Sequence, residues 1–130
     1  MTEELVTLET AKLLKAAGFK EDVSSFYELV YKGGSGPEYE IDESYDAQNY
    51  NTDVYSISAP TQSIAQRWLR ETKKLHITIY NSASGYTYDI SKVDMGTVLY
   101  CFPEGPNDGG NWDTYEEALE AGIIKALKLI

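Results

Sequence analysis

The chain has little of the chemistry on which most metal sites and covalent enzymes depend. Its 130 residues contain one cysteine, Cys101, and one histidine, His76. A single cysteine excludes an internal disulfide and indicates a reducing compartment. A single histidine leaves a zinc site without a second imidazole ligand. No apolar run approaches the ~20 residues of a membrane-spanning helix, and the opening "MTEELVTLETAKLLK" is acidic, unlike a signal peptide. We therefore expect a cytoplasmic protein with no membrane contact.

Basic residues are missing from two long windows. No lysine or arginine lies between Lys32 and Arg67 or between Lys92 and Lys125, and the formal net charge is −10. The acidic residues in these windows are Glu38, Glu40, Asp42, Glu43, Asp46 and Asp53, then Asp94, Glu104, Asp108, Asp113, Glu116, Glu117 and Glu120. Such a surface repels nucleic acid. It attracts basic proteins, including those whose usual partner is DNA.

Three helices are predicted. The first covers residues 8–17, with Thr7 as its N-cap and Gly18 as its stop. The second opens at Pro60 and Thr61 and buries one side that includes Trp68 and Leu69. Thr114 and Glu117 have the spacing of a capping box for the last helix. We expect the buried stripe of that helix to contain Tyr115, Leu119, Gly122, Ile123, Ala126 and Ile130.

Alternating patterns predict strands over residues 25–32, 75–80, 86–90 and 97–102, with short ones at 37–41 and 54–57. The content of 42% hydrophobic and 12% aromatic residues is that of a globular protein. The order of elements predicts a single α+β domain over residues 1–130. We expect a mostly antiparallel sheet of about four to six strands, with three helices packed against it. Long exposed loops are expected at residues 33–53 and 103–113.

Arg67, Arg70 and Lys74 fall at i, i+3 and i+7, which would place them on one face of the second helix. They form either a patch for phosphate or an acidic partner, or a solvated face whose cations favour a helix C-terminus. The solvated face is the simpler interpretation, because Glu71 and the surrounding acids weaken the patch.

Catalytic and metal-binding arrangements find no support in the sequence. A Cys101–His76 nucleophile pair is conceivable, but Cys101 lies in "VLYCF", where a small buried residue is expected. "NDGGNWD" fails the calcium-loop pattern, because position 3 is Gly109 and position 6 is Trp112. Nothing selects which carboxylates would form an acid–base pair. We therefore assign no catalytic, cofactor-binding or metal-binding residue, and we expect no cofactor.

Contact surfaces are the remaining candidates. Eleven tyrosines indicate half-buried strands and binding surfaces, because a tyrosine ring packs while its hydroxyl stays solvated. Tyr45 and Tyr50 lie in the acidic segment, and Ile124 falls on the polar side of the last helix. An exposed isoleucine needs no explanation, but it would equally suit a subunit contact. A homodimer stays open as an alternative.

Three segments carry a resemblance to known proteins. "TLETAKLLKAAGF", "APTQSIAQRWLRETKKLHITI" and "TYEEALEAGIIKALKLI" occur in that order. Together they resemble a group of small uncharacterised proteins encoded by phages and prophages of gut Bacteroides-type bacteria. The resemblance implies a setting inside a bacterial host cell and carries no catalytic motif. The segments at 42–53 and 102–112 depart from that group and are where a specific partner would bind.

These features lead to a hypothesis of a non-enzymatic phage or prophage accessory protein that acts through protein–protein contacts. A sharper version is an acidic DNA mimic that inhibits a host DNA-binding protein. The rival is a small hydrolase or nuclease that uses carboxylates with Mg²⁺, which needs at least two acids converging in a pocket. Nucleic-acid binding through the basic residues of the second helix is disfavoured by the overall charge.

Overall fold

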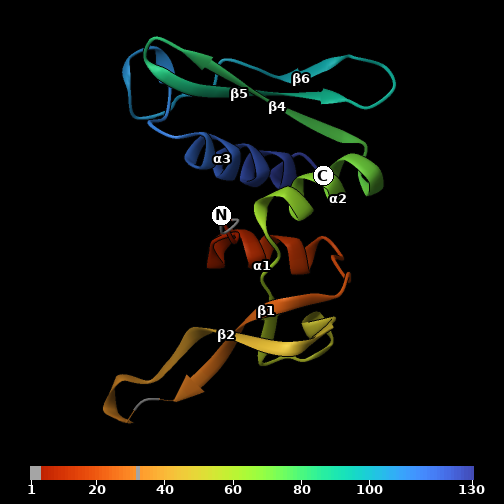
Figure 1. Cartoon of the computed structure of the whole chain (residues 1–130), viewed down its shortest axis with the longest axis vertical. Helices are drawn as coiled ribbons and strands as arrows, with labels where there is room; N and C mark the ends of the chain where they lie inside the picture. Colours follow the sequence, from red (N-terminus) through yellow and green to blue (C-terminus); the bar gives the residue numbers. More distant parts are fainter. Residues whose placement is uncertain (1–3, 32) are drawn as a thin grey trace. The chain divides into compact units, whose positions relative to one another are not determined.

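The computed structural model describes residues 4–31 and 33–130 (Figure 1). Contacts divide the chain into two compact units, Leu5–Thr61 and a second unit made of Glu4 with Gln62–Ile130. The described residues form three α-helices and six strands, so the predicted α+β class is confirmed. The strands form two antiparallel sheets of three strands each, rather than one larger sheet.

The first unit holds one helix and one sheet. Its helix is α1 (Leu8–Ala16), and its strands are β1 (Val23–Tyr31), β2 (Pro37–Gln48) and β3 (Ser56–Ser58). The strand order is β2-β1-β3, so β1 is central and the other two strands are edges. Two short 3₁₀ turns, η1 (Gly33–Ser35) and η2 (Tyr50–Thr52), lie between the strands.

Helix α1 forms as its sequence predicts, one residue shorter at its end. The Thr7 hydroxyl accepts a hydrogen bond from the Thr10 N–H at 3.4 Å, as an N-cap should. Gly18 has a φ of +95°, which glycine adopts without steric cost. The next residue, Phe19, donates its N–H to the Leu14 carbonyl at 3.0 Å and is fully buried. This stop anchors the end of α1 in the core of its unit.

The predicted loop at 33–53 is the main correction to the sequence interpretation. Residues Pro37–Gln48 form strand β2, so the short strand expected at 37–41 continues for seven more residues. Ten of its twelve side chains are exposed, and this exposure explains why the segment resembles a loop in sequence. Its identity as a strand comes from backbone pairing with β1, because an edge strand needs no buried side chains to keep its ladder.

Asn51 closes the outer edge of the sheet at β3. Its side-chain oxygen accepts from the Ser58 N–H at 2.8 Å, and its side-chain nitrogen donates to the Phe19 carbonyl at 2.8 Å. Beside it, the Tyr50 N–H donates to the Ser58 hydroxyl at 3.0 Å. One amide group therefore joins η2, the edge of β3 and the end of α1.

The second unit holds two helices and the other sheet. Its elements are α2 (Gln62–Thr72), β4 (Leu75–Ser82), β5 (Gly85–Lys92), β6 (Val98–Tyr100) and α3 (Tyr115–Lys128). The strand order is β4-β5-β6, and α3 lies along one face of this sheet (Figure 1). Trp68 and Leu69 of α2 are buried, as expected. Gln62 joins the two helices, because its side-chain nitrogen donates to the Glu116 carbonyl at 2.9 Å and to the Glu120 carboxylate at 2.8 Å.

Thr114 is confirmed as the N-cap of α3, which is one half of the predicted capping box. The Glu117 N–H donates to the Thr114 hydroxyl at 3.1 Å, and the hydroxyl and the Glu117 carboxylate are 2.9 Å apart. The middle of the predicted stripe is buried, at Leu119, Gly122, Ile123 and Ala126. The two ends were predicted wrongly, because Tyr115 is 43% exposed and Ile130 is 56% exposed. Tyr115 occupies the first turn, and Ile130 lies beyond the last residue of the helix.

Gly122 sets how closely α3 approaches its sheet. A Cβ atom at this position would lie 2.9 Å from Cγ2 of Ile77 and 3.3 Å from the ring of Tyr88. Both neighbours are buried side chains on the inner face of β4 and β5. At Gly122 the backbone of α3 therefore packs directly against the sheet, whereas at other contact positions a side chain lies between helix and sheet.

The strand expected at 97–102 is shorter than predicted, since β6 ends at Tyr100. The loop at 103–113 is present, with a 3₁₀ turn, η3 (Asp108–Gly110), inside it. The loop is fixed to the sheet at its end, where Trp112 and Tyr86 exchange two backbone hydrogen bonds of 2.8 and 2.7 Å. No helix in the described part of the chain is long and apolar enough to cross a membrane.

The first prediction concerns Gly122. Gly122→Val should lower the free energy of unfolding by about 1–3 kcal/mol, because the new side chain meets Ile77 and Tyr88 and overpacks the core. Chemical denaturation measures the change. The control is Lys128→Val, at an exposed position of the same helix. Equal stability of Gly122→Val and the wild type would mean that α3 does not approach the sheet as closely as described.

The second prediction concerns Asn51. Asn51→Ala should cost about 2 kcal/mol of unfolding free energy, because it removes hydrogen bonds to two backbone groups. Asn51→Asp keeps the acceptor for Ser58 but turns a charged acceptor toward the Phe19 carbonyl, so it should also destabilise the chain. Thr52→Ala, at the exposed neighbouring residue, serves as the control and should change stability by less than about 0.5 kcal/mol. If the control and Asn51→Ala are equally stable, Asn51 does not close the edge.

Candidate functional site

The hairpin of β1 and β2 has two chemically different faces. Partners in the register share a face, because side chains directly opposite each other in an antiparallel pair point to the same side. On one face Tyr27 stands opposite Ile41, Leu29 opposite Tyr39, and Tyr31 opposite Pro37. On the other face Glu28 stands opposite Glu40, Phe26 opposite Asp42, and Val30 opposite Glu38. The hairpin is therefore amphipathic, with an apolar face and an acidic face.

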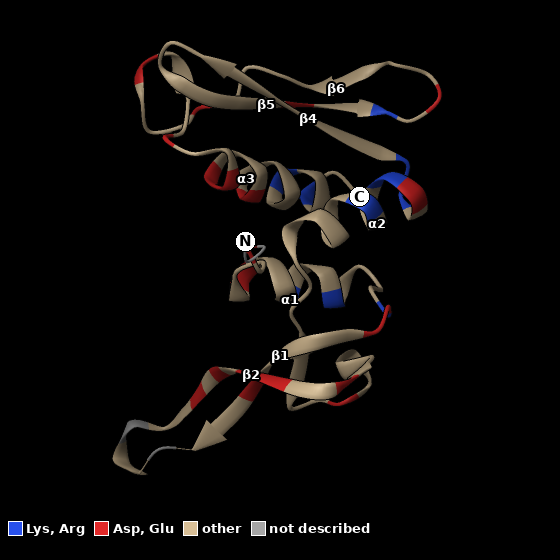
Figure 2. Ribbon diagram, viewed as in Figure 1, with Lys and Arg blue, Asp and Glu red and all other residues tan. Residues whose placement is uncertain are grey.

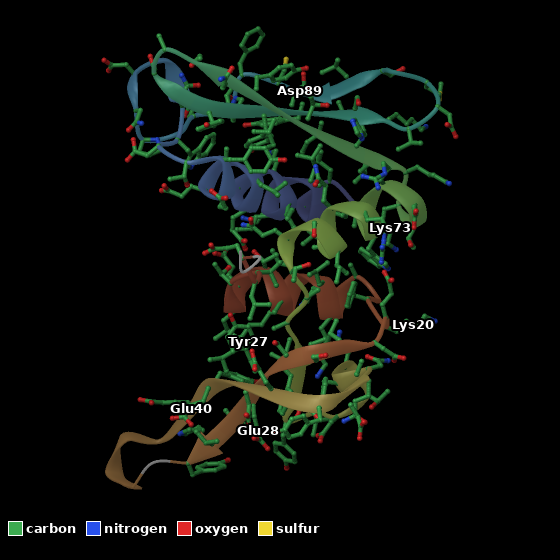
Figure 3. All side chains as sticks on the ribbon, in the orientation of Figure 1. Lys20, Tyr27, Glu28, Glu40, Lys73 and Asp89 are labelled. Atoms are coloured by element: carbon green, nitrogen blue, oxygen red, sulfur yellow. The ribbon has the colours of Figure 1, made fainter. Side chains whose placement is uncertain are left out.

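The acidic face gathers four carboxylates on two neighbouring strands. We define it by its residues, Glu28, Glu38, Glu40 and Asp42, all of which are exposed. Figure 2 shows the acidic stretches of β2 in red, and Figure 3 labels Glu28 and Glu40. No lysine or arginine occurs in either strand. Glu28 and Glu40 are direct cross-strand partners, and like charges in that position destabilise a sheet.

The apolar face is partly covered from within its own unit. The Tyr27 hydroxyl donates to the Val6 carbonyl at 2.9 Å, and the Lys12 ammonium lies 5.1 Å from the centre of the Tyr39 ring. Ile41 remains 50% exposed and Tyr31 75% exposed. The apolar face thus continues from a covered region to an open one at β2.

The predicted contact residues in the acidic segment separate from each other. Tyr45 is fully exposed on β2. Tyr50 is buried, its ring stacks on Phe26 with centroids 4.1 Å apart, and it belongs to the core. Tyr50 is therefore wrong as a contact residue. Ile124 is half-buried on α3, so it offers less surface than its place on the polar side suggested.

The predicted basic face of α2 does not form as one helical surface. Arg67 is exposed and Arg70 is half-buried, but α2 ends at Thr72, so Lys74 lies outside the helix. Lys74 has a φ of +59°, and its carbonyl accepts from the Val93 N–H at 2.9 Å. Lys73 turns toward Trp68, whose ring centre is 5.5 Å from its ammonium. The three cations therefore do not share one helical face, because α2 ends at Thr72, before Lys74.

The expected burial of Cys101 is also wrong. The chain leaves the sheet after Tyr100, so Cys101 is exposed, and Phe102 follows with a φ of +58° and 90% exposure. Met95, Val98 and Leu99 are exposed as well, at 66%, 54% and 45%. No hydrogen bond joins His76 to Cys101 in the described part of the chain. Exposed apolar side chains therefore surround the position where the sequence predicts a buried cysteine.

The two faces of the second sheet are unequal. Ile77, Tyr88 and Ile90 are buried on the face toward α3. Burial raises the pKa of the Tyr88 phenol to about 12, with a smaller effect from Tyr100. On the other face the Tyr80 hydroxyl donates to the Asp89 carboxylate at 2.7 Å, and this hydrogen bond raises the pKa of Tyr80.

The loop at 103–113 carries a polar hollow lined by Ser84, Pro106, Asn107, Asp108 and Asp113. The Asn107 side-chain amide donates to the Asp113 carboxylate, so the two side chains satisfy each other. Across residues 4–31 and 33–130, no three His, Cys, Asp or Glu side chains are grouped so that they could hold a metal ion. Two of the residues that line the hollow, Asn107 and Asp113, are thus hydrogen-bonded to each other within the loop.

The sequence contained the signal for the two-faced hairpin. "EYEID", residues 38–42, alternates acid with Tyr39 and Ile41, and that period of two is the period of a strand. The residues around this segment are highly polar, so the alternation is easily overlooked. Comparison with known proteins adds no assignment, because no family model, no curated protein and no solved structure matches the chain.

The third prediction concerns the pair Glu28–Glu40. Glu28→Lys replaces a repulsive cross-strand pair by an attractive one, so it should raise the free energy of unfolding by a few tenths of a kcal/mol, up to about 1. Asp22→Lys makes the same change of two charges at an exposed site next to β1 that has no such partner. Chemical denaturation of the two variants separates the pair from the general effect of lowering the negative charge. A larger gain from Asp22→Lys would contradict the pairing.

Proposed function

We propose that the chain is a phage- or prophage-encoded accessory protein that acts by binding another protein through the acidic face of the β1–β2 hairpin. One observation carries the proposal: four exposed carboxylates lie on two paired strands that contain no base. Two of these carboxylates are direct cross-strand partners at a cost in stability. The phage setting is supported by the resemblance of the three sequence segments.

A basic protein surface is the partner that fits this face. A net charge of −10 repels nucleic acid and other acidic proteins over a Debye length of about 8–10 Å. It raises the rate of encounter with a cationic surface. In the sharper version of the proposal, the partner is a host DNA-binding protein whose DNA site the acidic face occupies.

Two alternatives have less behind them. A carboxylate- and Mg²⁺-dependent hydrolase needs at least two acids that converge in a pocket. Asp108 and Asp113 both line the polar hollow, but the described residues hold no group of three His, Cys, Asp or Glu side chains that could bind a metal ion. A homodimer is favoured by one observation, the four exposed apolar side chains in and beside β6, Met95, Val98, Leu99 and Phe102. It is compatible with binding at the hairpin, since these residues and the acidic face belong to different strands.

The fourth prediction tests the acidic face. The full chain is immobilised, and proteins retained from a bacterial host lysate are identified at low and at high salt. We expect basic proteins to be retained at low salt and released at high salt. A variant with Glu28→Gln, Glu38→Gln, Glu40→Gln and Asp42→Asn should lose most of this binding. The matched control removes four exposed charges elsewhere, by Glu71→Gln, Asp94→Asn, Glu104→Gln and Asp108→Asn, and should retain it.

Two outcomes would contradict the proposal. One is equal retention by the hairpin variant and the matched control, which would reduce binding to overall charge. The other is a turnover activity together with no retained protein. Added duplex DNA tests the DNA-mimic version, because it should displace the chain from its partner only if both bind one site.

A further inference from the structure

The two edge strands of the β2-β1-β3 sheet differ in whether their outer sides are hydrogen-bonded. At β3 the outer side is closed, because Asn51 and Tyr50 hydrogen-bond with Ser58. At β2 no further strand pairs with the outer side in the described part of the chain. The sheet therefore ends in one closed edge and one open edge.

The backbone direction along β1 shows which groups β2 turns outward. Leu29 donates its N–H to the Tyr55 carbonyl at 2.9 Å, and the Ser25 carbonyl accepts from Ala59 at 2.9 Å. Ser25, Tyr27 and Leu29 thus direct their backbone groups toward β3. Backbone groups alternate in direction along a strand, so the residues between them, Phe26 and Glu28, direct theirs toward β2.

The register between β1 and β2 shows which residues of β2 direct their backbone groups toward β1. Phe26 and Glu28 pair with Asp42 and Glu40, so these acidic residues use their backbone groups in the ladder to β1. Tyr39 and Ile41 lie between acidic residues and turn their N–H and C=O groups to the open edge. The open edge thus offers two donors and two acceptors.

The usable edge is short and has defined ends. Pro37 has no N–H at one end. At the other end the Glu43 N–H already bonds to the Asp42 carboxylate at 2.8 Å, and the register shifts after Glu43. A segment of about five to seven extended residues matches this length.

The side chains along the edge determine what such a segment must carry. In an antiparallel addition, residues opposite Tyr39 and Ile41 lie on the apolar face, and residues between them lie beside Glu38, Glu40 and Asp42. Lys12 near the Tyr39 ring disfavours a second cation on the apolar face. Basic residues are therefore favoured on one face only, and apolar ones on the other.

We propose that the open edge of β2 binds an extended segment of a partner protein, with alternating basic and apolar residues, as a fourth antiparallel strand. This inference rests on the proposed function and specifies the partner. Backbone hydrogen bonds at Tyr39 and Ile41 give affinity, and the two faces give specificity. A second copy of the chain is a poor occupant, because pairing β2 with itself places acids beside acids.

The fifth prediction uses a blocked synthetic peptide of about seven residues in which lysine and valine alternate. We expect saturable binding at low salt. On binding, hydrogen exchange at the Tyr39 and Ile41 amides should slow, while the Glu40 amide, already in the ladder, should change little. A peptide with glutamate in place of lysine should not bind.

Backbone methylation separates strand addition from simple charge attraction. Methyl groups on the valine nitrogens, which face β2, should weaken binding about tenfold or more by removing hydrogen bonds. The same groups on the lysine nitrogens, which face away, should have a smaller effect. On the protein side, Ile41→Pro removes an outward N–H at an edge position where proline is tolerated, and Ile41→Thr keeps the N–H as its control.

The outcomes distinguish this inference from the proposed function. If both methylated peptides bind as well as the parent peptide, strand addition is wrong and the acidic-face proposal stands. No binding of the parent peptide also overturns strand addition. If neither the peptide nor any basic protein binds, both proposals fail. Self-association of the chain that Ile41→Pro abolishes would identify a second copy as the occupant and overturn the inference.

Discussion

Backbone N–H and C=O groups at the edge of a β-sheet need partners, and this requirement organises both units of the chain. Two of the three strands in a three-stranded sheet are edge strands, so a large share of the backbone groups in such a small sheet lies at an edge. Two edges are closed by side-chain amides from neighbouring elements. Asn51 bonds with Ser58 of β3, and Gln66 of α2 donates to the Ile77 carbonyl of β4 at 3.0 Å. At β2 the arrangement is different, because in the described part of the chain no strand pairs with its outer side, where acidic side chains are exposed.

Charged side chains along an edge strand can prevent unwanted strand pairing and can also determine which partner strand is accepted. Natural proteins place charges on edge strands to prevent uncontrolled pairing, and the carboxylates of β2 would disfavour pairing with another copy for the same reason. In our proposal the same carboxylates also attract a strand of opposite charge, so they would select the partner as well. The position of Glu28 opposite Glu40 supports the second role, because protection of the outer edge needs no acid on the central strand β1.

How far the sequence predicts this structure depends on which residues carry the signal. The caps of α1 and α3 are confirmed because Thr7, Gly18 and Thr114 act locally, through neighbours within a turn of helix. Beyond residue 41 the sequence predicts a loop where β2 continues, because the strand is held by its pairing with β1 and its own side chains are mostly exposed. The burial of Tyr50 and the exposure of Cys101 depend on tertiary contacts, which no spacing rule contains. The acidic residues were found from the sequence, but their shared face required the register.

A strand that binds at β2 would change the energetics of the hairpin itself. Without a partner, the repulsion between Glu28 and Glu40 acts against the β1–β2 ladder. A basic side chain placed beside Glu40 would reduce that repulsion while the partner backbone satisfies the outward groups of Tyr39 and Ile41. Because binding and folding are linked, a partner that prefers the paired hairpin must stabilise it by the same free energy. Under this proposal, the pairing of Glu28 with Glu40 is less unfavourable in the bound state than in the free chain.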